Sequence, residues 1–579
     1  MPFDDSRRLT GINLYFAATG AVLETVGLNI DAALLGEWEA RVCRMRAELG
    51  WPDAALVARV HASGASLAFA APLDQLLTAT EVNEWALLSS STRGTEAFHA
   101  PGHAAAWDEG SALHTLRAFA RIERNPQLVA LAHAAETRGL TVLIDEDALS
   151  IGVGGGSRSW PLTHLPTQTE IDWTVLHDAP IALVTGSNGK TTTTRLLAAF
   201  TRAHGWRTAY TCTDGVFVGA DQLAAGDYSG PAGARVALRE ATVDAAILET
   251  ARGGLLRRGI AVQHANVAVV TNVSDDHFGE YGVHDLDDLA AVKLVVARAL
   301  GAAGTLVLNA DDPSLVHHAP RRRVAWFALD ADASLLRAHR TRGGATCGVR
   351  NGHLHLQHGE DDHDLGAIAG MPLSFNGAAL YNIGNIAAAV LAASALGIIP
   401  DLLRDVLADF GRARADNPGR LQHWSVGGLS VFVDYAHNPH GLRGLLEVAT
   451  KSRSSRLGVL LGQAGNREDA ELHELAAVAA EFRPDLILLK EIGGMLRGRG
   501  EGEVPALLRD ELARHGLREP DVVERHDEYQ AVRDALTWAR NGDLLVLPIH
   551  GTAAKPQVDA LLDTLQSLGW IAGTPLPVD

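Results

Sequence analysis

A glycine-rich turn in the chain has the residue types of a phosphate-binding loop. The segment Leu183-Val-Thr-Gly-Ser-Asn-Gly-Lys-Thr-Thr-Thr193 runs from a short apolar stretch into the expected start of a helix. Backbone N–H groups at such a turn, together with a helix N-terminus, bind anions. We expect Lys190 to reach the terminal phosphates of a nucleotide and the Thr191 hydroxyl to ligate Mg²⁺. The general pattern has another glycine where this chain has Val184, so the loop is a variant. The loop residues expected to contact nucleotide are Gly186, Ser187, Asn188, Gly189, Lys190, Thr191 and Thr192.

Two polar residues that follow later apolar segments are candidate metal ligands. Glu249 comes directly after segment 244–248 and precedes a glycine-rich stretch, and His277 follows segment 267–271. Ligands gather at the carboxyl ends of strands in an open parallel sheet, so Glu249 is well placed as a second magnesium ligand. A structural role as a loop anchor is the alternative. A lone histidine is usually an ordinary surface or core residue, but beside the phosphate loop and Glu249 we expect His277 to bind metal.

Alternating apolar and helical segments predict the sheets that must position these residues. Strands separated by helices favour a parallel sheet with crossover helices. The first series predicts such a sheet, followed by an alanine-rich helix over 385–396. The second series predicts a doubly wound α/β domain. The expected strands are 181–185, 244–248, 267–271 and 305–309, then 429–434, 457–461, 486–490 and 544–548.

The length of 579 residues predicts several domains, at roughly 150 residues each. The first block mixes short apolar strands with a helical stretch over 114–138. The glycines of 152–156 and the prolines after them have the composition of a loop or linker. The expected domains are 1–177, 178–411 and 412–579.

Composition and charge exclude several classes of protein. The chain has 50 basic and 69 acidic residues, a net charge of −19, which argues against a general nucleic-acid binder. Three scattered cysteines fit neither a disulfide framework nor a metal site, and indicate a reducing cytoplasm. Neither a signal peptide nor a membrane span is expected. Only five of the basic residues are lysines, and arginine cannot readily replace a lysine that must lose its proton and react.

The order of these motifs resembles that of the Mur ligase superfamily, the ATP-dependent amide ligases of peptidoglycan precursors, folylpolyglutamate and cyanophycin. The variant loop has that family's own form. The closest similarity is to the C-terminal ligase half of cyanophycin synthetase, and it covers about 178–579. It implies an α/β protein of three domains: an N-terminal α/β domain, a central P-loop ATPase domain and a C-terminal Rossmann-like domain. The motifs that carry it are Glu249-Thr-Ala-Arg-Gly-Gly254, Asn272-Val-Ser-Asp-Asp-His-Phe-Gly279, Leu308-Asn-Ala-Asp-Asp-Pro313 and Lys490-Glu491.

The resemblance implies a role for Lys293. In Mur ligases a lysine on the helix after the histidine motif is often carbamylated, and its carbamate helps to hold a second Mg²⁺. Lys293 matches that lysine, with a solvent-exposed helix lysine as the alternative. The implied metal ligands are then Thr191, Glu249, His277 and Lys293.

The resemblance also implies further nucleotide contacts. Asn382 and Asn385 would lie near the base or ribose, although helix capping would equally explain an asparagine there. Arg420 would reach the nucleotide phosphates when the domains close. Asp434 would take the ribose hydroxyls, and His437 would lie near the nucleotide or the reacting groups.

The implied activity is an ADP-forming amide ligase that uses ATP and two Mg²⁺ ions. It would join the carboxylate of an amino-acid or peptide-like substrate to an amine through an acyl phosphate. Three alternatives remain: an ammonia-using enzyme with a glutaminase partner, a polyglutamylating ligase, and an inactive nucleotide-binding scaffold. The first 177 residues hold no ATP-grasp core and are expected to recognise the carboxylate substrate. We expect small-molecule partners, no nucleic acid and no membrane, and leave a homo-oligomer open.

Overall fold

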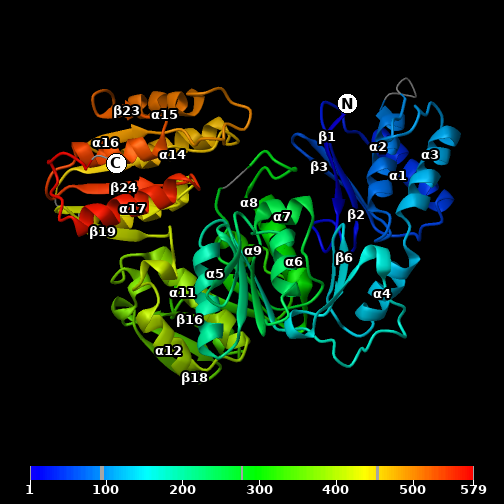
Figure 1. The fold of residues 1–579 in the computed structure, drawn as a ribbon, viewed down its shortest axis with the longest axis horizontal. Coiled ribbons are helices and arrows are strands. Elements are labelled where there is room, and N and C mark those ends of the chain that lie inside the picture. Colours follow the sequence, from blue (N-terminus) through cyan, green and yellow to red (C-terminus); the bar gives the residue numbers. More distant parts are fainter. Residues whose placement is uncertain (1, 92–96, 276–277, 452–454, 578–579) are drawn as a thin grey trace.

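The computed structural model describes residues 2–91, 97–275, 278–451 and 455–577 (Figure 1). The N-terminal part and the C-terminal domain lie at opposite ends of the molecule, and the central domain lies between and below them. The described residues form sheets of four, eleven, six and three strands. No described helix is long and apolar enough to cross a membrane.

The described residues of the N-terminal part form two antiparallel sheets and four α-helices. The four-stranded sheet has the order β1-β2-β4-β3, and the three-stranded sheet has the order β5-β6-β7. The strands are β1 Phe3–Leu9, β2 Gly20–Thr25, β3 Leu56–His61, β4 Gly64–Ala70, β5 Val142–Ile144, β6 Ala148–Ile151 and β7 Arg158–Pro161, and the helices are α1 Ala32–Glu48, α2 Leu76–Ser91, α3 Glu109–Glu123 and α4 Pro126–Glu136.

The expected helical stretch over 114–138 is two helices. The α3 helix ends at Glu123, and α4 begins at Pro126 with Asn125 as its N-cap. The Asn125 side chain accepts a hydrogen bond from the Leu128 N–H. Proline suits the first position of a helix because it has no N–H to satisfy there, and it would break a helix interior.

Of the two alternatives for 152–156, the loop is confirmed and the linker is wrong: the segment joins β6 to β7 through a short 3-10 helix over Gly154–Gly156. Gly154 and Gly156 are buried, and a Cβ on Gly154 would lie 2.1 Å from the carbonyl oxygen of Val243. Val153 and Leu143 belong to the same apolar core as the central sheet. Glycine occurs here because two backbones approach closely, and the two parts of the chain share one core.

The central domain is built on the eleven-stranded sheet, in the order β11-β10-β9-β12-β8-β13-β14-β15-β16-β17-β18. The run from β9 to β16 is parallel, and the two strands at each edge pair in antiparallel fashion. The strands are β8 Ile181–Thr185, β9 Thr208–Cys212, β10 Gly215–Val218, β11 Asp221–Ala225, β12 Ala245–Glu249, β13 Ala265–Val270, β14 Leu300–Asn309, β15 Val324–Asp330, β16 Ala345–Arg350, β17 His353–His358 and β18 Asp361–Ala367. The helices are α5 Lys190–Ala203, α6 Pro231–Arg239, α7 Arg252–Arg257, α8 Leu286–Lys293, α9 Pro313–His317, α10 Ser334–Arg340, α11 Leu380–Ala395 and α12 Pro400–Asp409.

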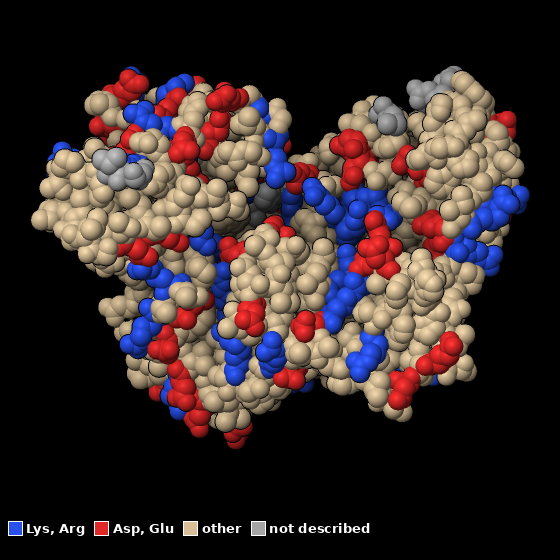
Figure 2. Space-filling model, in the orientation of Figure 1, with Lys and Arg blue, Asp and Glu red and all other residues tan. Residues whose placement is uncertain are grey.

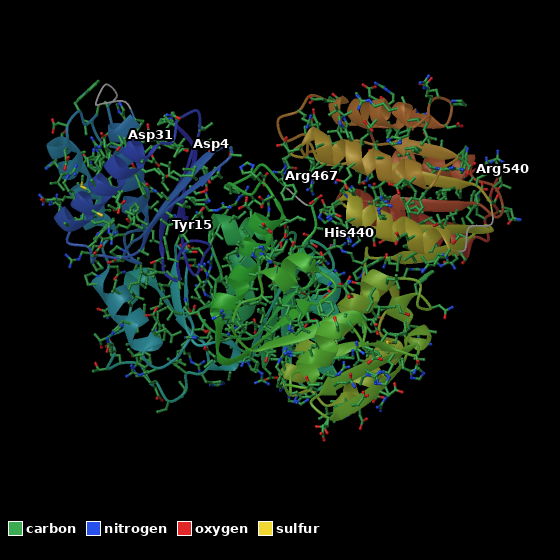
Figure 3. The ribbon with its side chains drawn as sticks, turned by 180° about the vertical axis from the view of Figure 1, so that it is seen from behind. Asp4, Tyr15, Asp31, His440, Arg467 and Arg540 are labelled. Carbon is green, nitrogen blue, oxygen red and sulfur yellow. The ribbon has the colours of Figure 1, made fainter. Side chains whose placement is uncertain are left out.

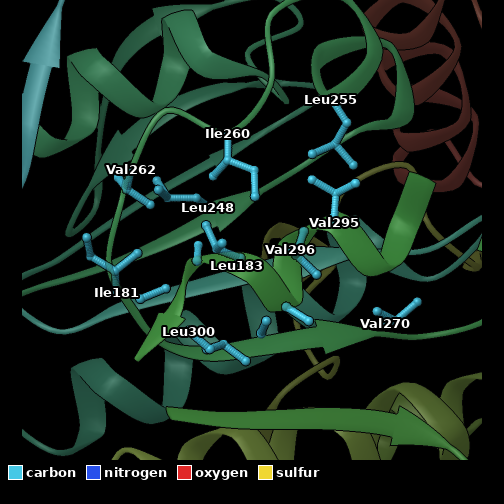
Figure 4. Packing of buried hydrophobic residues seen from close by; sticks show 14 of the residues in the cluster. Ile181, Leu183, Leu248, Leu255, Ile260, Val262, Val270, Val295, Val296 and Leu300 are labelled. Carbon is cyan, nitrogen blue, oxygen red and sulfur yellow. The ribbon is translucent and has the colours of Figure 1, made fainter. Parts of the chain in front are cut away.

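Both faces of this sheet are buried, as expected for parallel strands covered by helices. Leu183 of β8 packs with Leu248 of β12 and Val296 in one apolar core (Figure 4). Their neighbours Ala182 and Val184 face the opposite core, beneath α5 and α11. The strand positions expected from the sequence are confirmed to within two residues, except that β14 begins five residues early, at Leu300.

The C-terminal domain has a six-stranded sheet in the order β19-β20-β24-β21-β22-β23. Only β19 is antiparallel to its neighbour, so the doubly wound α/β expectation is confirmed. The strands are β19 Gln422–Val426, β20 Leu429–Asp434, β21 Leu457–Leu461, β22 Leu486–Leu489, β23 Val522–Glu524 and β24 Leu544–Pro548, and the helices are α13 Pro439–Thr450, α14 Asp469–Glu481, α15 Glu503–Arg514, α16 Glu528–Trp538 and α17 Ala554–Ser567.

We predict that Leu143→Ala loosens the central sheet as well as the N-terminal part. Leu143 is 1% exposed in the shared core, and a Leu→Ala change there costs about 2–5 kcal/mol. Hydrogen exchange should become faster in β8 and β12. Leu131, equally buried but packed only against N-terminal residues, is the matched control, and Leu131→Ala should leave exchange in β8 and β12 unchanged. Unchanged exchange in both variants would contradict a shared core.

Candidate active site

The turn between β8 and α5 requires glycine at two positions. Gly186 has a φ of +146° and Gly189 a φ of +84°, which favour a residue without a side chain. A Cβ on Gly186 would lie 1.9 Å from the Thr271 hydroxyl oxygen, and one on Gly189 would lie 2.0 Å from the Asn385 side-chain oxygen. The Thr271 hydroxyl also donates to the Asn188 carbonyl at 2.6 Å. The loop is therefore held tightly from two sides, with the start of α5 directly behind it.

The Thr191 hydroxyl and the Glu249 carboxylate meet beside this loop. Parallel pairing of β12 with β8 sets Glu249 opposite Val184, and the Thr191 hydroxyl donates to Glu249 Oε2 at 2.8 Å. Glu249 is 2% exposed, and its Oε1 has no hydrogen-bond partner among the described residues. Burial raises the pKa of Glu249, although nearby Lys190 and the Thr191 hydrogen bond lower it. The Thr191 hydroxyl and the two Glu249 carboxylate oxygens are buried together, and Oε1 has no hydrogen-bond partner among the described residues. This arrangement fits Mg²⁺, which prefers oxygen ligands.

Two lysines line the same cavity as this pair. Lys190 Nζ donates to the carbonyls of Gly186 and Ser187, at 3.0 and 2.9 Å. Lys293 lies in the last turn of α8 and is 1% exposed, so the alternative of a solvent-exposed lysine does not hold. His277, the remaining expected metal ligand, lies outside the described residues.

The junction with the C-terminal domain brings Arg420 to the phosphate loop. Its Nη2 lies 3.4 Å from the Thr191 hydroxyl and 3.1 Å from that of Thr213. Its guanidinium stacks over the Tyr435 ring, 4.7 Å from the ring centre. Arg420 is therefore positioned by both domains, with its charge directed at the loop.

Neighbouring polar contacts fasten the junction to α5 and the loop. Arg195 of α5 pairs with Asp214 at 2.6 Å and donates to the Pro418 carbonyl at 3.0 Å. The Asn417 side chain donates to the Thr192 hydroxyl at 3.2 Å. A second link joins the start of α13 to the loop, because the Asn438 amide donates to the Asn188 side-chain oxygen at 3.1 Å.

Asn382 and Asn385 are buried on α11 and line the cavity. Asn385 donates to the Asn382 side-chain oxygen at 3.1 Å, and Asn382 donates to the Leu373 carbonyl at 3.0 Å. The N-cap of this helix is Ala379, so neither asparagine is the cap. Asn385 instead packs against Gly189, which connects α11 to the phosphate loop.

Asp434 ends β20 and also lines the cavity. Its Oδ1 accepts from the Ala436 N–H at 2.7 Å, and its Oδ2 accepts from the Leu421 N–H. Burial raises the pKa of Asp434, opposed by nearby Arg420. The ring of His437 lies 5.4 Å from that of Tyr435, between centroids, and His437 lines the cavity too. The segment 434–437 therefore lies across from the phosphate loop.

One cavity of about 1080 Å³ lies between the central and C-terminal domains. The space-filling view shows the molecule hollowed between its two upper parts, with lysine and arginine side chains along the hollow (Figure 2). His440 and Arg467, also in the lining, lie on the side of the C-terminal domain that faces the central domain (Figure 3). Every expected site residue that the structure describes belongs to this lining.

Sequence reasoning missed several polar residues of the cavity. Thr213 comes directly after β9, so the rule that ligands gather at strand ends could have found it. Arg252 lies inside the motif Glu249-Thr-Ala-Arg-Gly-Gly254. It forms an ion pair with Glu280, which no local sequence pattern predicts. Glu280 also accepts from Asn466 at 3.4 Å, which links the central domain to the C-terminal domain.

Comparison with known proteins identifies the family. The Mur ligase middle domain matches residues 184–393, and the Mur ligase glutamate ligase domain matches residues 419–548. The chain belongs to the Mur ligase family. This Mur ligase is 37% identical to the cyanophycin synthetase of Trichormus variabilis over 375 residues, which are 64% of this chain and 41% of that protein. It thus spans about two fifths of the length of the cyanophycin synthetases it matches.

More distant similarity extends to other Mur ligases. The UDP-N-acetylmuramoyl-L-alanyl-D-glutamate–2,6-diaminopimelate ligase of Thermosynechococcus vestitus is 27% identical over 384 residues, 64% of this chain and 71% of that protein. Among solved structures, a bifunctional folylpolyglutamate synthase/dihydrofolate synthase from Yersinia pestis matches with a TM-score of 0.47 at 20% identity, over 66% of this chain and 90% of that one. The expected fold class and family are confirmed.

We predict opposite effects of Glu249→Gln on the ligand-free and magnesium-bound protein. The pKa of the Glu249 carboxyl is higher in the folded protein than in the unfolded chain. Its contribution to stability is therefore fully present below the unfolded pKa of about 4.3 and is lost as the pH rises through the folded pKa. At pH 7 the buried carboxylate therefore costs stability, and Glu249→Gln should raise the thermal midpoint without ligand. The same variant should weaken magnesium-dependent nucleotide binding by about tenfold or more.

Thermal melts at pH 5 and pH 7, with and without Mg²⁺, together with nucleotide titrations, would check both effects. Glu136→Gln, an exposed carboxylate on α4, is the control and should change neither. A Glu249→Gln protein that binds magnesium nucleotide as the parent does would exclude Glu249 as a metal ligand.

Proposed function

We propose that this Mur ligase is an ATP-dependent, ADP-forming amide ligase. It joins the carboxylate of an amino-acid or peptide-like substrate to an amine. The observation that carries the proposal is the hydrogen bond between the Thr191 hydroxyl and Glu249, with the orphaned Glu249 oxygen, next to the phosphate loop. Arg420 of the domain junction lies at the same hydroxyl.

Each of the chain's own groups has a role in this proposal. The loop amides from Gly186 to Thr192 bind phosphate oxygens, and Lys190 adds a compact positive charge. Thr191, Glu249, His277 and a carbamate on Lys293 would hold two Mg²⁺ ions. When bound, ATP and Mg²⁺ supply the phosphoryl group and the charge neutralisation that turn a carboxylate into a reactive acyl phosphate.

The C-terminal domain completes the site in this proposal. Arg420 places a further positive charge beside the phosphates, where charge develops during phosphoryl transfer. Asn382 and Asn385 contact the base or ribose, Asp434 takes ribose hydroxyls, and His437 lies near the reacting groups. Contacts from the junction and from α13 to the phosphate loop support a closed arrangement, which keeps water from hydrolysing the activated carboxylate.

The proposal divides the chain into three working parts. Residues 178–411 bind the nucleotide, and residues 412–579 close over it. Residues 1–177 recognise the carboxylate substrate. A basic amine such as arginine is suggested by the similarity to cyanophycin synthetases, and the net charge of −19 suits a cationic ligand.

The first test is product analysis with a panel of carboxylates and amines. We expect ADP and phosphate to be released only when both a carboxylate and an amine are present, with one amide formed per ADP. Mass spectrometry of the product distinguishes an added amino acid from ammonia or from a glutamate chain. AMP and pyrophosphate as products would contradict the proposal, and unstimulated nucleotide binding without turnover would indicate a scaffold.

The second test concerns Lys293. A carbamate forms from an unprotonated amine, which arginine does not supply. We expect Lys293→Ala to lose most activity and to recover part of it when a short-chain carboxylic acid is added. Lys293→Arg, which keeps the charge, should stay inactive under the same conditions. Parent-level rates in Lys293→Ala would rule the carbamate out.

A further inference from the structure

A second buried lysine lies in the C-terminal domain, apart from the phosphate loop. Lys490 follows β22 and is 0% exposed. Its Nζ contacts a Glu528 carboxylate oxygen, the Pro548 carbonyl at 2.6 Å and His550 Nδ1 at 3.1 Å. An ammonium has three N–H groups, so each has an acceptor. Nothing in the proposed ligase chemistry uses this lysine directly.

The cluster is closely fitted around its charges. Glu528 also accepts the backbone N–H groups of His550 and Gly551, both at 2.8 Å. A Cβ on Gly462 would lie 2.5 Å from Lys490 Cγ, and one on Gly551 would lie 2.6 Å from Glu528 Oε2. Burying two charges costs several kcal/mol per ion unless the geometry is well satisfied. A buried ion pair costs free energy of folding that apolar packing would not, which points to a role for this pair other than stabilising the fold.

The Lys490 ammonium decides the protonation of His550. An ammonium can only donate, so His550 Nδ1 must accept and the ring proton must lie on Nε2. Nε2 then donates to the Ala436 carbonyl at 3.1 Å. Burial, and then the charge of Lys490, lower the pKa of His550 to about 3, so the ring stays neutral. His550 lines the active-site cavity, and its ring meets that of Tyr435 edge-on.

A continuous series of contacts leads from His550 to the junction arginine. The Ala436 N–H donates to Asp434 Oδ1, and Asp434 Oδ2 accepts from the Leu421 N–H. Leu421 is the neighbour of Arg420, whose guanidinium stacks on Tyr435. We propose that Lys490 is a positioning residue, which fixes the His550 tautomer and thereby holds the segment 434–437 and Arg420 in place over the active site. Its effect on turnover rests on the proposed ligase function, but its effect on His550 and on the segment does not.

Histidine side-chain NMR tests the tautomer without any substrate. In protein labelled at histidine, with the His550 signal assigned by its loss in His550→Gln, the parent should show the neutral form protonated at Nε2 from pH 6 to 8. In Lys490→Met, buried Glu528 loses its cation, so His550 should take up a proton within this range. In Lys490→Met/Glu528→Gln, His550 should be neutral again. A parent His550 protonated at Nδ1, or a signal unchanged in Lys490→Met, would overturn the proposal.

Hydrogen exchange tests the effect on the segment. The amides of residues 435–437 should exchange faster in Lys490→Met and in the double variant, which keeps the domain folded if the single variant does not. Lys451→Met, at a lysine that is exposed and donates to the Ala378 carbonyl, is the matched control and should leave these amides unchanged. Protection at 435–437 equal to the parent's in both Lys490 variants would show that the cluster is only structural.

Turnover separates positioning from binding. The phosphate loop in the central domain keeps its own contacts, so in the double variant the Kd for magnesium ATP should rise by a smaller factor than that by which kcat falls, and kcat should fall about tenfold or more because Asp434 and Arg420 are no longer held in place. Lys490→Arg keeps the charge but not the compact ammonium, and should not restore kcat. Parent-level kcat in the double variant would overturn the proposal. If the parent catalyses no amide formation, the ligase function fails, and the NMR and exchange results alone decide the role of Lys490.

Discussion

A buried carboxylate, with one oxygen that no described residue satisfies, is the constraint around which this protein is arranged. Glu249 is fixed at the end of a central parallel strand, beside a loop whose amides attract anions. Carboxylate and bound phosphate would repel each other unless a cation lay between them. The Thr191 hydroxyl, Lys190 and Arg420 all come within reach of this one position. In the proposed function, the affinity for nucleotide would therefore be coupled to cation binding by electrostatics, and the glycines of the loop would allow the phosphates to approach closely.

The N-terminal part does more than lie beside the nucleotide domain. Arg59 pairs with Asp288 at the start of α8, the helix that ends at Lys293. Arg7 stacks over the Tyr281 ring at 4.5 Å and also donates to the Leu256 carbonyl at the end of α7. These contacts brace α7 and α8, and α8 carries Lys293, a metal ligand in the proposed function. If residues 1–177 recognise the substrate as proposed, these contacts would transmit its binding to the helix that carries Lys293.

Local signals in the sequence were sufficient for the glycine-rich loop, the strand-end carboxylate and the eight strands expected in the two later domains, because each depends on neighbouring residues. They failed where distant backbones meet. The glycines of 152–156 look like a linker until Val243 is placed against them. The family resemblance supplied Arg420 and Asn385, whose roles no spacing could reveal. The β16–β17 hairpin had a local signal that the sequence reasoning missed: Asn351-Gly352 forms the turn between the two strands, and polar and apolar residues alternate from His353 to Leu356.

The hydrogen bonds between α5 and the domain junction at residues 417–418 affect how the C-terminal domain could move. Arg195 and Thr192 hold Asn417 and Pro418, whereas the start of α13 is held to the loop by a neutral amide contact through Asn438. The neutral contact breaks more easily than the charge-assisted one. If the C-terminal domain opens as the proposed function requires, the junction would act as its pivot. Residues close to the junction, Arg420 among them, would then move a short distance and the far side of the domain a longer one, so that substrates could enter and products leave while Arg420 stayed near the loop.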